Sequence, residues 1–261
     1  MSASNEFYVG YLPTPARQRR FLLVFLPLCA LLAFALAAFV GAFARPTGDG
    51  VWDTGHEVTM EGELLATPFP MLRVVRADGA IERVLLVEMG KHGADARVAP
   101  LVPTDGTRVA AQARGFLIAR GGQRMLELVE ENPITLGGTL PARVDARAIG
   151  TVEISGEIVD SKCWLGVMKP GNGKAHRDCA TLCIRGGIPP SIICEAPDGT
   201  ERRALVVGRD GTPLAFDSLA PWIAAPVVIR GNAEVIDGMA IVRVEQIARA
   251  DELLLATEHA R

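Results

Sequence analysis

Hydrophobic and polar positions divide the chain into one long apolar segment and a larger region of short alternating runs. Residues 21–43 are apolar apart from the breaks at Pro27 and Gly41. A helix rises about 1.5 Å per residue, so this run is long enough to cross a hydrocarbon core of roughly 30 Å. The pattern predicts a transmembrane helix over 21–43.

The charges beside this run predict its orientation. Arg17, Arg19 and Arg20 precede it, and positive charge tends to stay on the cytoplasmic side of a membrane. The region after the helix is therefore expected to be exported. Residues 42–44, Ala-Phe-Ala, would suit cleavage of a signal peptide. The run is longer than the usual apolar core of about 7–15 residues in such peptides, which favours an uncleaved anchor.

The exported region contains an internal repeat, which indicates two copies of one β unit. Three pairs of segments match: 62–64 with 156–158, 84–87 with 204–207, and 126–128 with 242–244. The offset is 94 residues for the first pair and 120 for the second. The second copy therefore carries 26 extra residues between its first and second strands.

The pattern of residues in each copy predicts five strands, with an Asp-Gly turn in the first hairpin. The expected strands are 58–65, 71–77, 81–88, 107–119 and 123–130 in the first copy, and 152–159, 191–196, 201–208, 226–236 and 239–247 in the second. A helical link at 216–224 would follow the third strand, as in an OB barrel. The expected fold is mainly β: an N-terminal transmembrane helix followed by two tandem OB-like five-stranded barrels. Another small antiparallel barrel or sandwich is the alternative.

The expected organisation follows from these elements. It comprises a cytoplasmic tail at 1–20, the transmembrane helix at 21–43, a linker at 44–56, a first OB-like domain at 57–135, a second at 150–250 with a Cys/His insertion at 160–190, and a C-terminal tail at 251–261. The connection between the first two strands of an OB barrel commonly lines its ligand site. The insertion is therefore the expected site of chemistry.

Charge and cysteine content limit the classes of function. Beyond residue 45 the chain carries 23 Lys and Arg against 29 Asp and Glu, and this negative balance argues against a nucleic-acid partner. Cys29 lies in the apolar run, and the other four cysteines follow it. An even number of cysteines in an oxidising compartment makes disulfides the default expectation.

The insertion also has the residue types of a metal site. Glycines and prolines on both sides predict one short helix, on which His176, Cys179 and Cys183 share a face. With Cys163 they would form a set of three thiolates and one imidazole, as in structural zinc sites. Copper is the alternative metal, because thiolates and the thioether of Met168 are soft ligands.

Two other interpretations of the insertion remain open. The four exported cysteines, Cys163, Cys179, Cys183 and Cys194, could form disulfides that fasten a docking loop to the barrel. A cysteine near His176 could instead be a reactive thiol with a lowered pKa. The absence of a Cys-x2-Cys pair counts against that third interpretation.

Three more residues are weaker candidates. Asp160 could support a metal ligand, Trp164 could anchor a partner, and His92 lies in a loop after a predicted strand. Each has an ordinary alternative: a strand-end aspartate, a core tryptophan and a solvated turn histidine. No Ser-His-Asp set, phosphate-binding loop or catalytic carboxylate pair stands out in the sequence.

Several stretches resemble a known group of proteins. Residues 156–163, 176–183, 186–190 and 7–13 are similar to those of an uncharacterised group of bacterial membrane-anchored exported proteins with a Cys…His-x2-Cys-x3-Cys stretch. The resemblance implies export and membrane attachment and brings no activity. The expected location is the bacterial inner membrane, with a single span, a cytoplasmic N-terminus and periplasmic C-terminal domains.

These expectations favour a non-catalytic role. The leading hypothesis is an anchored accessory, assembly or docking protein that docks onto a membrane-associated redox complex or delivers a metal to it. Its expected partners are the lipid bilayer and a membrane protein, and its expected cofactor is zinc or copper in the insertion or none. One alternative is a periplasmic thiol-dependent oxidoreductase or metalloenzyme. Another is a module that binds a small ligand or a lipid.

Overall fold

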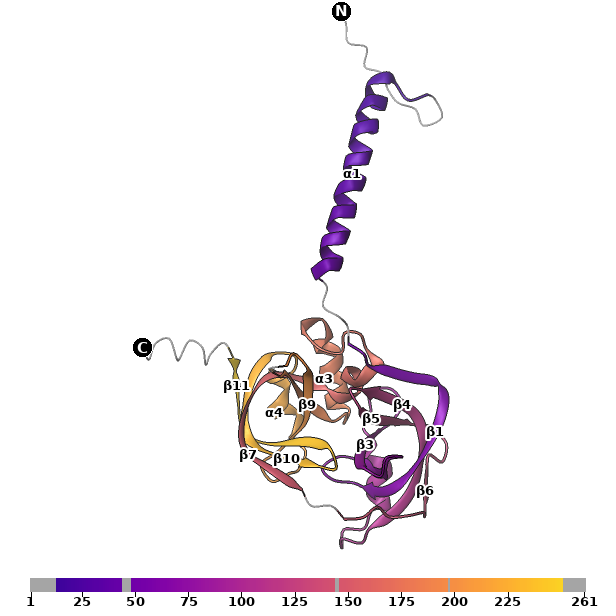
Figure 1. Cartoon of the computed structure of the whole chain (residues 1–261), viewed down its shortest axis with the longest axis vertical. Helices are drawn as coiled ribbons and strands as arrows, with labels where there is room; N and C mark the ends of the chain where they lie inside the picture. Colours follow the sequence, from indigo (N-terminus) through magenta and orange to yellow (C-terminus); the bar gives the residue numbers. More distant parts are fainter. Residues whose placement is uncertain (1–12, 44–47, 144–145, 197, 251–261) are drawn as a thin grey trace, which may run out of the picture. The chain divides into compact units, whose positions relative to one another are not determined.

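The computed structural model describes residues 13–43, 48–143, 146–196 and 198–250, which fall into two compact units, 1–47 and 48–261. The first unit contains one helix, α1 (Ala16–Phe43) (Figure 1). It is the one helix in the described part of the chain that is long and apolar enough to cross a membrane. An N-terminal apolar helix is thus confirmed. It starts before residue 21 because the arginines of its polar flank continue the same helix.

The second unit begins with a closed barrel. Its strands are β1 (Val51–Leu65), β2 (Met71–Val75), β3 (Ile81–Val87), β4 (Val109–Arg120) and β5 (Gln123–Leu128). They pair in the order β1-β2-β3-β5-β4, and β4 closes the barrel onto β1. All pairs are antiparallel except β3 with β5. A short strand, β6 (Ile134–Leu136), extends the sheet beside β4.

A second barrel with the same topology follows in the chain. Its strands are β7 (Arg147–Asp160), β8 (Pro190–Glu195), β9 (Glu201–Val207), β10 (Pro226–Ile236) and β11 (Met239–Arg249). They close in the order β7-β8-β9-β11-β10, and β9 and β11 are the parallel pair. This is the strand order of the first barrel, so the predicted tandem OB-like barrels are confirmed.

The repeat extends to the register of individual residues. Arg73 pairs with Arg83 across β2 and β3, and Ile193 pairs with Arg203 across β8 and β9. The offset of 120 residues seen in the sequence is therefore also the structural offset. The final hairpins agree at an offset of 116 residues, which is also that of segments 126–128 and 242–244, because Gln123 and Met239 are the first residues of their last strands.

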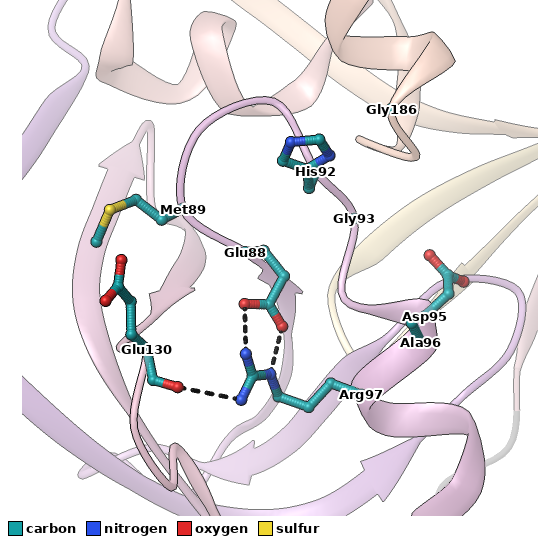
Figure 2. A pocket seen from close by; sticks show the side chains of 9 residues that line it. All are labelled: Glu88, Met89, His92, Gly93, Asp95, Ala96, Arg97, Glu130 and Gly186. Atoms are coloured by element: carbon teal, nitrogen blue, oxygen red, sulfur yellow. Dashed lines mark hydrogen bonds and ion pairs between the residues drawn. The ribbon is translucent and has the colours of Figure 1, made fainter.

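Helical links follow the third strand of each barrel. They are α2 (Asp95–Val98) and η1 (Ala99–Leu101) in the first barrel, and α4 (Phe216–Leu219) and η4 (Ala220–Trp222) in the second. The loop that enters α2 borders an open pocket of about 790 Å³ (Figure 2). Glu88 on this loop accepts hydrogen bonds from Arg97 of α2, which fixes the link across the pocket.

Apolar side chains fill each barrel and also join the two. The joining cluster takes Met71, Leu85, Ile118 and Met125 from the first barrel, and Val159, Leu205, Val207 and Ile241 from the second. Trp164 and Leu165 of the insertion pack in the same cluster and are almost fully buried. Burying such a side chain contributes about 1.5–3 kcal/mol. The insertion is therefore part of the core between the barrels.

Pairing between distant strands extends the first sheet beyond the predicted elements. β1 begins at Val51, inside the stretch expected to be linker, because its first residues pair with the far end of β4. β6 was not predicted and is also held by pairing with β4. The expected tail at 251–261 lies outside the described residues.

Candidate functional site

The insertion leaves the second barrel at Asp160, the last residue of β7. The chain makes a helical turn, η2 (Cys163–Val167), then a short turn, η3 (Lys174–His176), which continues into α3 (Arg177–Arg185). It rejoins the barrel at Pro190, the start of β8. The expected short helix is present, and Gly187, with a φ of 97°, takes the left-handed conformation just past its end, where glycine is favoured.

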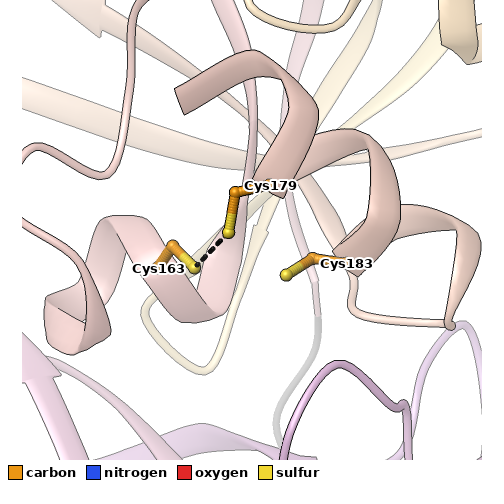
Figure 3. Close-up of side chains that lie close together, drawn as sticks. All are labelled: Cys163, Cys179 and Cys183. Carbon is orange, nitrogen blue, oxygen red and sulfur yellow. Dashed lines mark hydrogen bonds between the residues drawn. The ribbon is translucent and has the colours of Figure 1, made fainter. Parts of the chain in front are cut away.

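Three cysteine sulfurs gather inside the insertion (Figure 3). Cys163 comes from η2, while Cys179 and Cys183 lie four residues apart on α3 and so share a face. The three sulfurs lie within 4.8 Å of one another, and those of Cys163 and Cys179 are 4.0 Å apart. All five cysteines of the chain lie in its described part, and none of them forms a disulfide.

These distances suit ligands of one ion. A zinc–thiolate bond of about 2.3 Å in tetrahedral geometry places two sulfurs roughly 3.8 Å apart. The separation of Cys163 and Cys179 already matches this value closely. The remaining separations need to shorten by at most about 1 Å, which side-chain rotation can supply.

A lysine from the first barrel reaches this sulfur cluster, which consists of Cys163, Cys179 and Cys183. The Nζ atom of Lys91 lies 2.8 Å from the sulfur of Cys179 and 3.6 Å from that of Cys183. The hydrogen bond to Cys179 is the main reason that the pKa of Lys91 is raised to about 12. Lys91 therefore holds a positive charge beside the sulfurs.

The cluster favours one thiolate. The pKa of Cys183 is lowered to about 7, first because the Cys163 thiol donates a hydrogen bond to it and then because of the charge of Lys91. The pKa of Cys163 is raised for the same reason, with burial adding to the effect. A thiolate is the form that binds metals and attacks electrophiles.

A buried carboxylate and imidazole adjoin the cluster. Asp160 accepts a backbone hydrogen bond from Cys163 at 2.8 Å, and its other oxygen lies 3.0 Å from Nε2 of His176. Asp160, Cys163 and His176 form a second group of potential ligands within 4.8 Å. Cys163 thus belongs to two adjoining groups. His176 lies on the Asp160 side and is not gathered with Cys179 and Cys183 as the sequence predicted.

A second lysine fixes the loop that carries Lys91. Lys162 is buried, and its Nζ donates to Glu127 at 2.6 Å and to the carbonyls of Glu88 at 2.9 Å and Gly90 at 2.7 Å. These contacts satisfy all three donors of its ammonium group. Lys162, next to Cys163 in the chain, thereby holds the loop that carries Lys91 over the cluster.

Glycine allows the loop and the insertion to touch. The Gly93 N–H donates to the carbonyl of Gly186 at 2.9 Å. A Cβ atom at Gly186 would overlap the carbonyl oxygen of Lys91. Only a residue without a side chain permits the two backbones to approach this closely.

The other predicted residues lie outside the cluster. Trp164 is buried in the core between the barrels, and the Arg120 guanidinium stacks 4.4 Å from its ring. Met168 is 45% exposed. Cys194 lies in β8, where burial raises its pKa. His92 lines the open pocket shown in Figure 2.

Sequence reasoning missed both lysines. Lys91 is the neighbour of His92 in the loop after the third strand of the first barrel. Lys162 stands between two predicted site residues, Asp160 and Cys163. A buried lysine in such a position is a signal that could have been used, because lysine is rarely buried without a partner.

Comparisons with known proteins add no functional information. No protein-family model matches the chain, and neither does a curated protein or a solved structure.

Proposed function

We propose that the chain is an exported, membrane-anchored accessory protein that binds one soft metal ion through Cys163, Cys179 and Cys183 and presents it to a membrane-associated redox complex. The observation that carries this proposal is the approach of three sulfurs from two separate segments to within 4.8 Å. Thiolates are preferred ligands of Cu⁺ and Zn²⁺.

The surroundings of the sulfurs support a metal site over plain core packing. Cysteines that serve only as small apolar side chains need no charged neighbours, and burying charged groups is costly. Here Lys91 touches two of the sulfurs, and the buried pair Asp160–His176 adjoins the third. The three sulfurs alone fit Cu⁺ better than Zn²⁺, because structural zinc is almost always four-coordinate.

The accessory role rests on the anchor and on the position of the cluster. α1 would hold the protein at the bilayer, and Arg17, Arg19 and Arg20 favour a cytoplasmic N-terminus. Cys179 is only partly buried, and Leu182 beside it on α3 is 50% exposed. This edge of the cluster is where a partner protein would contact the site and exchange an ion.

Metal analysis of the full chain tests the proposal. The protein would be purified in detergent, without chelator and under reducing, oxygen-free conditions, then loaded with Cu⁺ or Zn²⁺ and separated from free ions. One Cu⁺ per chain is expected. Cys179→Ser and Cys183→Ser should each abolish retention, while Cys194→Ser, outside the cluster, should keep it.

Other results would decide against parts of this proposal. A chain that retains no ion, or one that retains it in both cluster variants, would contradict the metal site. One Zn²⁺ per chain that is lost in His176→Ala would replace the copper assignment with the four-ligand zinc set. Crosslinking in intact membranes followed by identification of bound proteins tests the docking role separately.

A thiol–disulfide oxidoreductase is the second candidate. The specific observation is the 4.0 Å separation of the Cys163 and Cys179 sulfurs. In such a reaction the two thiols would form a disulfide and pass two electrons and two protons to a disulfide of a partner protein, which becomes two thiols. Oxidation by glutathione disulfide and peptide mapping of the linked cysteines would detect it. A chain that keeps all its thiols would exclude it.

A further inference from the structure

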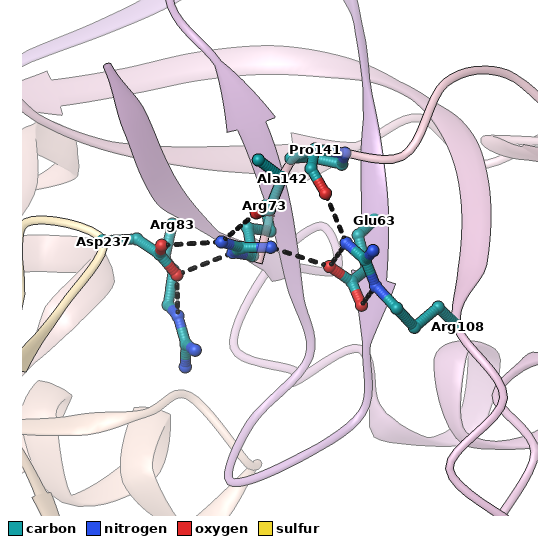
Figure 4. Close-up of polar contacts among 7 residues, drawn as sticks. All are labelled: Glu63, Arg73, Arg83, Arg108, Pro141, Ala142 and Asp237. Atoms are coloured by element: carbon teal, nitrogen blue, oxygen red, sulfur yellow. Dashed lines mark hydrogen bonds and ion pairs between the residues drawn. The ribbon is translucent and has the colours of Figure 1, made fainter. Parts of the chain in front are cut away.

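A network of charged side chains joins the two barrels away from the cysteines (Figure 4). Arg73 of the first barrel is buried and donates to Glu63 at 3.1 Å and to both carboxylate oxygens of Asp237 at 2.8 and 3.0 Å. Arg83 donates to the same carboxylate at 3.0 Å. Asp237 lies in the turn between β10 and β11. The final hairpin of the second barrel therefore carries a carboxylate to two arginines of the first.

The repeat places a second arginine in the equivalent position of the other barrel. Arg203 on β9 corresponds to Arg83 on β3 by the shared register. Arg203 donates from Nε to the side-chain oxygen of Gln123, which begins the last strand of the first barrel. Each of these arginines thus reaches the final hairpin of the opposite barrel, in a reciprocal arrangement.

The partners of these two arginines, Arg83 and Arg203, differ in charge. Arg83 meets the carboxylate of Asp237, whereas Arg203 meets only neutral groups: the amide of Gln123 and the hydroxyls of Ser161 and Ser191. Arg203 is 5% exposed, and no carboxylate pairs with it among the described residues. Burial lowers its pKa to about 10. A buried guanidinium without an anion is costly, which indicates that an anion is missing from its surroundings.

A pocket lies where that anion would be. It has a volume of about 190 Å³ and is lined by both barrels. Its charged lining consists of Arg76, Arg83, Arg124 and Arg203 with Glu82 and Asp237. Arg83 and Arg124 pair with the carboxylates of this lining, and Arg76 pairs with Asp78 outside it. Arg203 is therefore the arginine of the lining that has no carboxylate partner among the described residues. One water occupies about 30 Å³ in the liquid, so the pocket has room for several waters or one small oxyanion.

We propose that this inter-barrel pocket binds a small oxyanion, phosphate or a compact carboxylate, with Arg203 as its principal ligand. A guanidinium offers parallel N–H donors that match two oxygens of either group. Nη2 of Arg203 makes no hydrogen bond within the described chain, so a donor is free for the anion. This inference is independent of metal binding, because the pocket contains none of the cysteines.

Calorimetric titration of the full chain in detergent tests the proposal. Inorganic phosphate and acetate would be titrated separately, at an ionic strength held constant with sodium chloride. Saturable binding of one anion per chain is expected, and the probe that binds identifies the class of oxyanion. Arg203→Gln should weaken it at least about tenfold, the effect of losing a charged hydrogen-bond partner. Arg202→Gln, at an exposed neighbour on β9, should leave affinity unchanged.

A second variant keeps the test decisive if Arg203→Gln does not fold. Gln123→Glu places a carboxylate where Nε of Arg203 already donates. It should raise the thermal midpoint in anion-free buffer and weaken anion binding at least about tenfold, because the charge is then balanced internally. The proposal is overturned if neither probe binds the natural chain saturably, or if Gln123→Glu binds as tightly as the natural chain.

Discussion

At the scale of single residues, Lys91 and Lys162 lie beside the cysteines but have different effects on the site. Lys91 lies at the partly exposed edge of the sulfur cluster, where its charge favours a thiolate. Lys162 is enclosed, and every donor of its ammonium group has a partner in the first barrel. The first lysine therefore affects the chemistry of the sulfurs, and the second determines where the first can be.

Lys162→Met should be strongly destabilising. It leaves Glu127 as an unpaired buried charge, and breaking one side of a buried ion pair costs about 3–5 kcal/mol. Urea unfolding of the full chain in detergent would measure the loss. The double variant Lys162→Met with Glu127→Leu should recover much of it, because both buried charges are removed. An equal loss in the single and double variants would contradict this account.

Residue types alone indicated part of the site. The cysteines and His176 are rare side chains set between glycines and prolines, so their grouping was predictable, and three of the four predicted ligands do gather. Their division into two groups was not predictable, because the contact between His176 and Asp160 depends on how η3 turns into α3. Arg203 was missed because nothing local distinguishes a buried arginine from the exposed Arg202 beside it.

At the scale of elements, the insertion acts through its contact with the loop between β3 and α2. That contact requires glycine at position 186, where the carbonyl of Lys91 occupies the space of a side chain. The loop also carries the hydrogen bonds to Lys162. A change at this contact should therefore move Lys91 relative to the sulfurs.

Gly186→Ala tests this contact. The added methyl group forces the loop away, and overpacking of this kind costs about 1–3 kcal/mol. Thermal unfolding would report the loss of stability, and mass spectrometry after mild acetylation would report greater exposure of Lys91. Gly55→Ala is the matched control, because a Cβ there meets nothing closer than an ordinary contact. Unchanged acetylation of Lys91 in Gly186→Ala would contradict the expected movement.

The elements themselves were largely predictable, because the repeat supplied each strand twice. A weak alternation in one copy was supported by its counterpart, and both copies fold with the same strand order. The exceptions are the starts of β1 and β7 and the whole of β6. The start of β1 and β6 pair with β4, and the start of β7 pairs with β10. Pairing with a distant strand leaves no periodic pattern of its own in the paired residues.

At the scale of the whole molecule, the proposed function depends on which side of the membrane the barrels occupy. A reporter such as alkaline phosphatase, fused after the last residue, is active only when exported. It should be active on the natural chain. Replacing Arg17, Arg19 and Arg20 by Glu should sharply reduce its activity, because the positive charges that retain the N-terminus are lost. The control variant carries Glu at three exposed arginines of the barrels, Arg114, Arg202 and Arg230. The reporter should stay active in this variant.

The charge network beside the contact between the two barrels should make the stability of the folded chain fall in acid. Hydrogen bonds from Arg108, and then from Arg73, hold the pKa of Glu63 below its usual value of 4.5. Burial alone would raise the pKa of Asp237, but Arg73 and Arg83 outweigh it and hold that pKa below 3.8. Because these carboxyls take up protons more readily in the unfolded chain, they stabilise the folded one above pH of about 4.5, and that stability is lost as the pH falls through the lowered values.

The thermal midpoint of the full chain should therefore fall between pH of about 5 and pH of about 3. Asp237→Asn should lower the midpoint at pH 7 and flatten this decline, because its part of the charge-dependent stability is already absent. Asp198→Asn is the matched control, since that carboxyl has a lowered pKa but lies exposed in a turn of the second barrel. An Asp237→Asn chain with the same acid profile as the natural one would show that the Asp237 carboxylate adds nothing to the pH-dependent stability. The two barrels, and the oxyanion pocket between them, would then be held in place by the apolar cluster and by the hydrogen bonds of Lys162 and Arg203.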